Sequence, residues 1–144
     1  MKIAILGDCH FGVRNGAESF DRYFEKFFSD IFFPHLINNN ITTVIQVGDI
    51  FDNRKTIHIN SISRSTEFFF RKFEEYGIRL IILVGNHDSF YKDTIKINSP
   101  KLLLQNKFNN IKIIDEPTDI LLNDIDVTLL PWICKDNYNN TMEL

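Results

Sequence analysis

Leu80-Ile81-Ile82-Leu83-Val84-Gly85-Asn86-His87-Asp88 is the stretch of this chain that decides its fold. Its first half is a continuous apolar run, which is typical of a strand buried in a parallel sheet. Its second half is a glycine turn that carries an amide, an imidazole and a carboxylate. In an open α/β sheet the carboxyl ends of the strands meet at one crevice, so these polar groups can converge with groups that follow neighbouring strands.

Two earlier stretches repeat this arrangement of an apolar run followed by ligand-type residues. Asp8-Cys9-His10 follows Ile3–Leu6, and Gly48-Asp49-Ile50-Phe51-Asp52 follows Thr43–Val47. Asp and Asn near Gly are also ordinary turn residues. Three such turns after three apolar runs nevertheless favour a metal site, because oxygen ligands mixed with imidazole suit Mn, Fe or Zn. The set indicates a metal-dependent hydrolase.

Amphipathic helical patterns separate these strands. Aromatic and aliphatic residues recur at helical spacing in residues 20–32, and a second such pattern covers residues 59–76. We expect the aromatic stripe of the first helix to be core, Pro34 to kink or end that helix, and Gly77 to follow the second helix as its C-terminal glycine. Two successive β-α-β units predict parallel strands.

The pattern changes beyond residue 90. The sequence predicts a short helix, a strand and then a hairpin with its turn at Asn123-Asp124. These elements are Ser99–Leu104, Ile111–Ile114, and Ile120–Leu122 with Val127–Leu130. From Trp132 to Leu144 no completed element is expected, so the chain reads as the N-terminal part of a longer domain.

Composition places the chain among globular proteins of one-domain length. It has 144 residues, 44% of them hydrophobic and 24% charged, with a net charge of −3. A negative net charge gives no general attraction to nucleic acid. Cys9 and Cys134 make no disulfide framework, and Cys9 is expected to point away from the metal. No signal peptide or transmembrane span is predicted, which makes the cytoplasm the default location.

The three turn motifs resemble the first signatures of the calcineurin-like metallophosphoesterase superfamily, D-x-H, G-D-x-x-D and G-N-H-[DE]. Within it, the second motif and the motif spacing are similar to the nuclease subunits of SbcCD-type and phage recombination complexes. The resemblance implies an α/β fold of mixed β-sheets sandwiched by helices, with residues 1–144 as its N-terminal β-α-β-α-β half. It implies a DNA exo- or endonuclease that hydrolyses phosphodiesters in recombination and double-strand-break repair.

The resemblance also implies a ligand set. Asp8, His10 and Asp49 would hold one divalent metal ion, Asp49 and Asn86 would hold a second, and His87 would be the catalytic imidazole. The expected metal is Mn²⁺, with Fe, Zn or Mg as alternatives.

Four further residues are predicted to support this site. Asp52 and Asp88 are expected to orient the ligands rather than to bind metal. Arg54 and Lys55, a basic pair after the second motif, are expected to contact phosphate or DNA. Five lysines in residues 92–112 could also contact a phosphate backbone, but a solvated mixed surface is the favoured explanation for them.

The departure from the family pattern concerns later histidines. The family completes its site with a lone His and a Gly-His-x-His signature, whereas here His35 and His58 both precede the third motif. We expect them to be surface or packing residues. The chain alone is therefore expected to bind its first metal weakly and to hydrolyse little. The expected partners are DNA, an SbcC-type ATPase subunit, a second copy in a homodimer, or a second polypeptide that supplies the missing ligands.

Two other functions remain open at this level. One is a different calcineurin-like phosphoesterase, acting on nucleotides or cyclic nucleotides. The other is an inactive truncated fragment with a role in assembly. Protein phosphatases are disfavoured, because they usually carry Asp-Arg-Gly where this chain has Asp52-Asn53-Arg54 and Glu where it has Asp88.

Overall fold

A four-stranded parallel sheet forms the centre of the computed structural model, which describes residues 2–143. The strands lie in the order β1-β2-β3-β4 and every neighbouring pair is parallel. Their bounds are Ala4–Leu6, Thr43–Gln46, Arg79–Leu83 and Ile111–Ile114. The four predicted strands are confirmed, and so is the parallel pairing of the first three; β4 also pairs parallel to β3, although the part of the chain beyond residue 90 was expected to be antiparallel or mixed.

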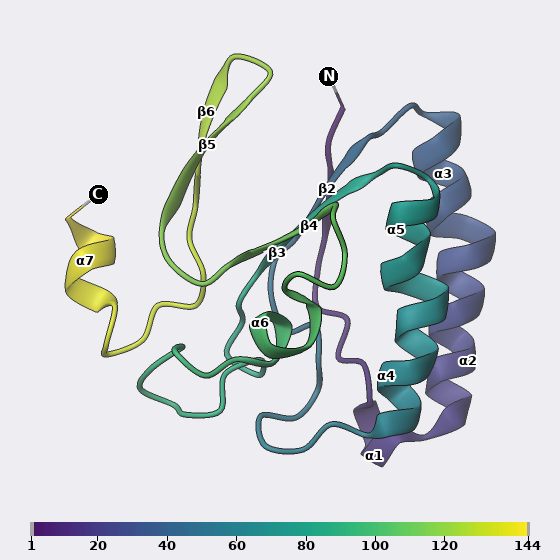
Figure 1. Cartoon of the computed structure of the whole chain (residues 1–144), viewed down its shortest axis with the longest axis horizontal. Helices are drawn as coiled ribbons and strands as arrows, with labels where there is room; N and C mark the ends of the chain where they lie inside the picture. The colour runs from purple at the N-terminus through teal and green to yellow at the C-terminus, as the bar shows by residue number, and fades with distance from the viewer. Residues whose placement is uncertain (1, 144) are drawn as a thin grey trace.

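Two long helical segments cover one face of this sheet (Figure 1). The short turn α1 comes before the first of these segments. Each segment is an α-helix with a π-helical turn in its middle. The bounds are Val13–Gly16 for α1; Glu18–Phe27, Phe28–Phe32 and Phe33–Asn38 for α2, η1 and α3; and Ile59–Ser65, Thr66–Phe70 and Arg71–Glu75 for α4, η2 and α5.

Phenylalanine rings fill the space between the helical layer and the sheet. Phe11 and Phe69 are each at most 1% exposed, and Phe69 contacts the rings of Phe28 and Phe73. The aromatic stripe of the first helix is therefore core in part only. Tyr23 and Ile31 of the same pattern are 74% and 60% exposed, because the sheet lies against one side of the helix.

Of the two outcomes predicted for Pro34, a kink or an end of the helix, the end does not occur, because the helical segment continues to Asn38. The Phe33 N–H donates to the Phe28 oxygen, five residues earlier, which is the hydrogen bond of a π turn. Pro34 consequently lies in the first turn of α3, where a missing N–H is tolerated. Gly77 does end the second segment as predicted, in a left-handed conformation with φ 63°.

An antiparallel hairpin packs against the other face of the sheet. Its strands are β5, Thr118–Leu122, and β6, Ile125–Leu129. The turn lies at Asn123-Asp124 as predicted, and both turn residues are left-handed. Leu122 and Leu129 pack against Ile81. On β1, at the edge of the sheet, Ile5 is 74% exposed, so the expectation of a fully buried first strand is wrong.

Two short helices complete the described chain. These are α6, Ser99–Leu104, as predicted, and α7, Tyr138–Met142. The sequence predicted no element after Trp132, but Asn137 accepts a hydrogen bond from the Cys134 N–H and donates one to the Trp132 oxygen, which closes a turn just before α7. Leu144 lies outside the described residues. None of the helices within residues 2–143 combines the length and apolarity needed to cross a membrane.

Candidate metal centre

The turns after β1 and β2 are tied together through their backbones. The N–H groups of Cys9 and His10 both donate to the backbone oxygen of Asp49, at 3.1 and 3.0 Å. The Phe11 N–H donates to the backbone oxygen of Ile50. These bonds continue the pairing of the two strands beyond their ends. As a result, Asp8 and His10 from the first motif lie beside Asp49 from the second.

A tight turn places Asp49 at the bottom of the crevice. Gly48 and Asp49 both have positive φ, 103° and 54°. Asp tolerates this left-handed conformation better than most residues do. A Cβ on Gly48 would lie 2.8 Å from the Gly85 Cα, so the absence of side chains lets the turns after β2 and β3 pack directly on each other.

Asp8, His10 and Asp49 form a cluster of potential metal ligands. One ligand atom from each lies within 4.8 Å of the others. His10 Nε2 lies 3.5 Å from Asp8 Oδ2 and 3.9 Å from Asp49 Oδ2. Asp49 is 9% exposed and Asp8 is exposed, so the cluster has a buried wall and an open side. Two carboxylates and an imidazole fit a divalent transition-metal ion.

Asn86 and His87 reach the same place from the turn after β3. Asn86 lines a pocket of about 300 Å³ together with Asp8 and Asp49. The His87 N–H donates to Asp49 Oδ1 at 2.8 Å, and the His87 ring meets the His10 ring edge-on at 5.0 Å. His87 Nδ1 lies 2.6 Å from the backbone carbonyl oxygen of Asp52. Because a carbonyl only accepts, Nδ1 carries the proton there, which leaves Nε2 available for chemistry.

The Asp52 carboxylate lies behind the His10 ring. Its Oδ1 is 3.4 Å from His10 Nδ1, on the opposite side of the ring from Asp8 and Asp49. Among the described residues His10 Nδ1 has no hydrogen-bond partner in good geometry. The Asp52 carboxylate is close enough to accept from it after a small adjustment of either side chain. A histidine that binds metal through one nitrogen is usually oriented through the other.

Asp52→Ala is expected to lower the affinity of the chain for Mn²⁺ by roughly 10-fold, the lower end of the effect of removing such a partner. His87 should keep its position, because it contacts the backbone oxygen of Asp52 and not its side chain. Isothermal titration calorimetry with Mn²⁺ measures the change, with Asp30→Ala on the exposed face of η1 as control. Equal affinities of the two variants would contradict the orienting role.

Asp88 ties the second and third motifs together from inside the protein. It is 1% exposed, and its carboxylate accepts from the N–H groups of Gly85 and Phe51. Burial raises the pKa of Asp88 to about 6, although these two donors act in the opposite direction. The contacts show Asp88 holding the turns in place.

Cys9 points into the core, away from the ligand atoms. Its thiol lies near the Gly7 oxygen, within the cluster of buried residues under the helices. Burial raises the pKa of Cys9 far above its ordinary range, and the carboxylates of Asp88 and Asp8 add to the effect. A thiol that stays protonated is a poor metal ligand. His35 and His58 are exposed, as expected.

Arg54 is engaged by the protein in a way the sequence did not indicate. Its Nη1 donates to the oxygens of Ser89 and Tyr91, both at 3.2 Å, and its guanidinium lies 5.1 Å from the centre of the Trp132 ring. Lys55, its neighbour, is exposed. The residue that sequence reasoning missed is Trp132, which lines the ligand pocket. The one feature of the sequence that could have drawn attention to Trp132 is that it is the sole tryptophan of the chain.

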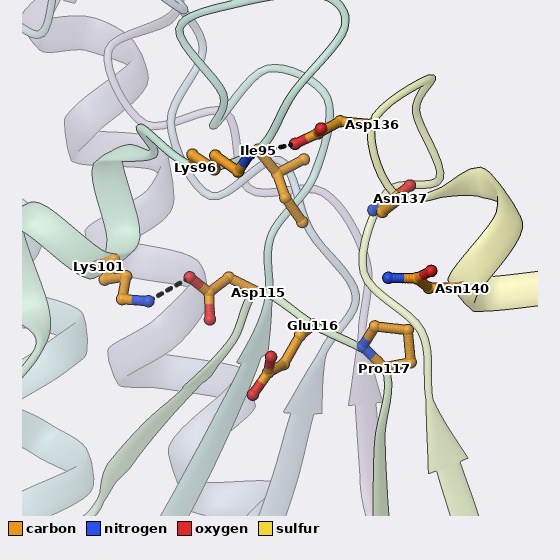
Figure 2. A pocket seen from close by; sticks show the side chains of 9 residues that line it. All are labelled: Ile95, Lys96, Lys101, Asp115, Glu116, Pro117, Asp136, Asn137 and Asn140. Carbon is orange, nitrogen blue, oxygen red and sulfur yellow. Dashed lines mark hydrogen bonds and ion pairs between the residues drawn. The ribbon is translucent and has the colours of Figure 1, made fainter.

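A second pocket, of about 670 Å³, lies beyond the end of β4 and is shown in Figure 2. Two of the five lysines in residues 92–112 reach it, and both are paired with acids. Lys101 contacts Asp115 and Lys96 contacts Asp136. Glu116 adds a further carboxylate to the lining. This mixture of charges favours a solvated surface for these two lysines over a phosphate-binding patch.

The fold and this site define a class of protein. A family model of calcineurin-like phosphoesterases matches residues 1–140, and the chain belongs to that family. The chain is also 36% identical, over 154 aligned residues, to exonuclease subunit 1 of Enterobacteria phage T4. That alignment covers 99% of this chain and 41% of the phage protein, so the chain spans less than half the length of this relative.

A solved structure resembles the chain in its fold. The nuclease MPE of Pseudomonas putida superposes with a TM-score of 0.53 at 15% sequence identity. The match covers 82% of this chain and 50% of the nuclease. The predicted fold class, an α/β phosphoesterase fold, is confirmed, and the match extends over about half of the nuclease.

Proposed function

We propose that this chain is the N-terminal part of a two-metal-dependent DNA nuclease that hydrolyses phosphodiester bonds in recombination and double-strand-break repair. The observation that carries the proposal is the convergence of Asp8, His10 and Asp49 within 4.8 Å, with Asn86 on the wall of the same pocket. Membership of the phosphoesterase family and the likeness to a phage exonuclease subunit support it.

The residues of the site have distinct roles in this proposal. Asp8, His10 and Asp49 hold one divalent ion, and Asp49 with Asn86 holds the other; Mn²⁺ is proposed, with Fe, Zn or Mg as alternatives. When bound, such ions supply Lewis-acid polarisation of a phosphoryl oxygen. His87, whose Nδ1–H donates to the Asp52 backbone oxygen, presents Nε2 toward the site; in the doubly protonated imidazolium form of the ring, Nε2–H is the group that donates a proton to the leaving oxygen.

The ligand count differs between the two proposed ions. The first has three protein ligands and the second has two, fewer than a tightly held ion requires. We propose that further ligands come from outside these 144 residues, either from the same polypeptide or from a second one. The chain by itself then binds metal weakly and hydrolyses little, and an assembly role without catalysis is the alternative.

The proposed partners follow from the phage relative, which is named as a subunit. We propose that the chain acts on DNA together with an SbcC-type ATPase subunit, with a homodimer as the alternative assembly. The cytoplasm of a phage-infected bacterium is the proposed location, since that is where a phage recombination nuclease meets its substrate.

The first test is Mn²⁺ binding and Mn²⁺-dependent cleavage by the purified chain. We expect calorimetry to show one weak Mn²⁺ site, and linear duplex and single-stranded DNA to be cut slowly or not at all, with EDTA abolishing any cleavage. A folded chain that binds no Mn²⁺ at millimolar concentration would contradict the metal site. Faster hydrolysis of a nucleoside monophosphate or a cyclic nucleotide than of DNA would favour the other phosphoesterases of the family.

A further inference from the structure

Trp132 forms part of the wall of the pocket that contains the candidate metal ligands. The lining of this pocket includes Asp8, Asp49 and Asn86 as well as Leu130, Pro131 and Trp132. The indole ring is partly exposed. The ring packs in part against the buried cluster of Val84, Ile95 and Cys134, so the part of it that stays exposed is what a molecule in the crevice can contact.

The backbone holds Trp132 on both sides. Its N–H donates to the Val84 oxygen at 2.8 Å, and its own oxygen accepts from Asn137 Nδ2 at 3.0 Å. Val84 comes directly before the turn that carries Asn86. The position of the indole is therefore coupled to the position of a proposed ligand.

Arg54 holds the ring from the side of the second motif. Its guanidinium lies 5.1 Å from the ring centre, and its Nη1 is bound to the oxygens of Ser89 and Tyr91. The two carbonyls hold the guanidinium beside the indole, which places a positive charge against the ring. A fixed aromatic ring next to a cation is the combination with which proteins bind single-stranded nucleic acid.

We infer that Trp132 stacks on an unpaired nucleobase next to the scissile phosphodiester, so that the site takes single-stranded nucleic acid rather than simple phosphate esters. The inference rests on the proposed function, because it requires the crevice of Asp8 and Asp49 to receive a phosphodiester. Arg54 is the positioning residue of this contact, and the base–indole stack selects the substrate class.

The fluorescence of Trp132 tests the stack directly, because the chain has a single tryptophan. In a buffer with Mg²⁺, the chain is titrated with single-stranded pentathymidylate and with an abasic strand that has the same number of phosphates. We expect the thymidylate to quench the emission and the abasic strand to leave it unchanged. Equal quenching by the two strands, or no quenching at millimolar thymidylate, would overturn the inference.

Substitutions test the same contact without using the fluorescence. Trp132→Ala should weaken binding of end-labelled pentathymidylate, followed by anisotropy, by roughly 5- to 150-fold, the effect of losing one stacked base. Trp132→Phe should retain most of the affinity, which separates stacking from a failure to fold. Tyr138→Ala, which removes an exposed aromatic side chain from α7, is the matched control and should bind like the wild type.

The outcomes separate this inference from the proposed function. A chain that binds Mn²⁺ but holds both strands equally well overturns the stack and leaves the metal site standing. A chain that shows base-dependent quenching without binding Mn²⁺ supports the stack and overturns the metal-dependent function. Unchanged thymidylate affinity in a folded Trp132→Ala variant overturns the stack independently of the fluorescence result.

Discussion

Asp49→Asn is expected to lower the affinity of the chain for Mn²⁺ by more than roughly 100-fold, because changing a residue that only orients a ligand already costs about 10- to 100-fold. The substitution removes charge and little else. Asn tolerates the left-handed backbone of Asp49, φ 54°, and its amide oxygen can still accept from the His87 N–H. Any metal-dependent hydrolysis should disappear with the metal.

Asp124→Asn is the matched control for this experiment. Asp124 is also left-handed, with φ 67°, and is exposed at the turn between β5 and β6, far along the chain from the three motifs. Calorimetric titration with Mn²⁺ compares the two variants with the wild type. A loss of affinity in both variants would show a general charge effect, and no loss in Asp49→Asn would mean that the metal binds elsewhere.

Gly85→Ala is expected to damage the fold and the site together. A Cβ at Gly85 would overlap the backbone nitrogen and Oδ1 of Asp49, which are both held in place. The free energy of unfolding should fall by at least the roughly 1–3 kcal/mol typical of overpacking, because one colliding atom belongs to the backbone and has little room to move. The Asp49 carboxylate must also shift, so Mn²⁺ affinity should fall as well.

Gly7→Ala controls for the change from glycine to alanine. Gly7 is exposed one residue before Asp8, its φ is outside the positive range, and a Cβ there would meet nothing within 4 Å. Urea unfolding followed by circular dichroism, together with Mn²⁺ calorimetry, compares the two alanine variants. If Gly85→Ala were as stable as Gly7→Ala and bound Mn²⁺ normally, the close packing of the second and third turns would be wrong.

Most of the secondary structure could be predicted from short-range patterns. The parallel strands were evident as apolar runs, and the hairpin was evident from Asn123-Asp124, because such patterns depend on residues within a few positions of one another. Gly77 was predictable for the same reason. The predicted ligands Asp8, His10 and Asp49 also lie together, since parallel strands carry their following turns to one edge of the sheet.

The errors concern features that depend on neighbours in space. Pro34 was expected to kink or end a helix, and it does not end it, because the π turn before it removes the need for its missing N–H. Ile5 was expected to be buried, but its strand lies at the edge of the sheet. Trp132 was treated as part of a structureless tail, whereas the Val84 oxygen and Arg54 hold it in the ligand pocket.

Strand, helix and turn identities, and the residue types offered to a metal, were already set by the order of residues along the chain. The contacts that side chains make with residues distant in the sequence were not. His87 meets Asp49 across 38 positions and Arg54 meets Ser89 across 35. No local pattern encodes such contacts, because they form only when the sheet brings distant turns to one edge and buried polar groups there need hydrogen-bond partners.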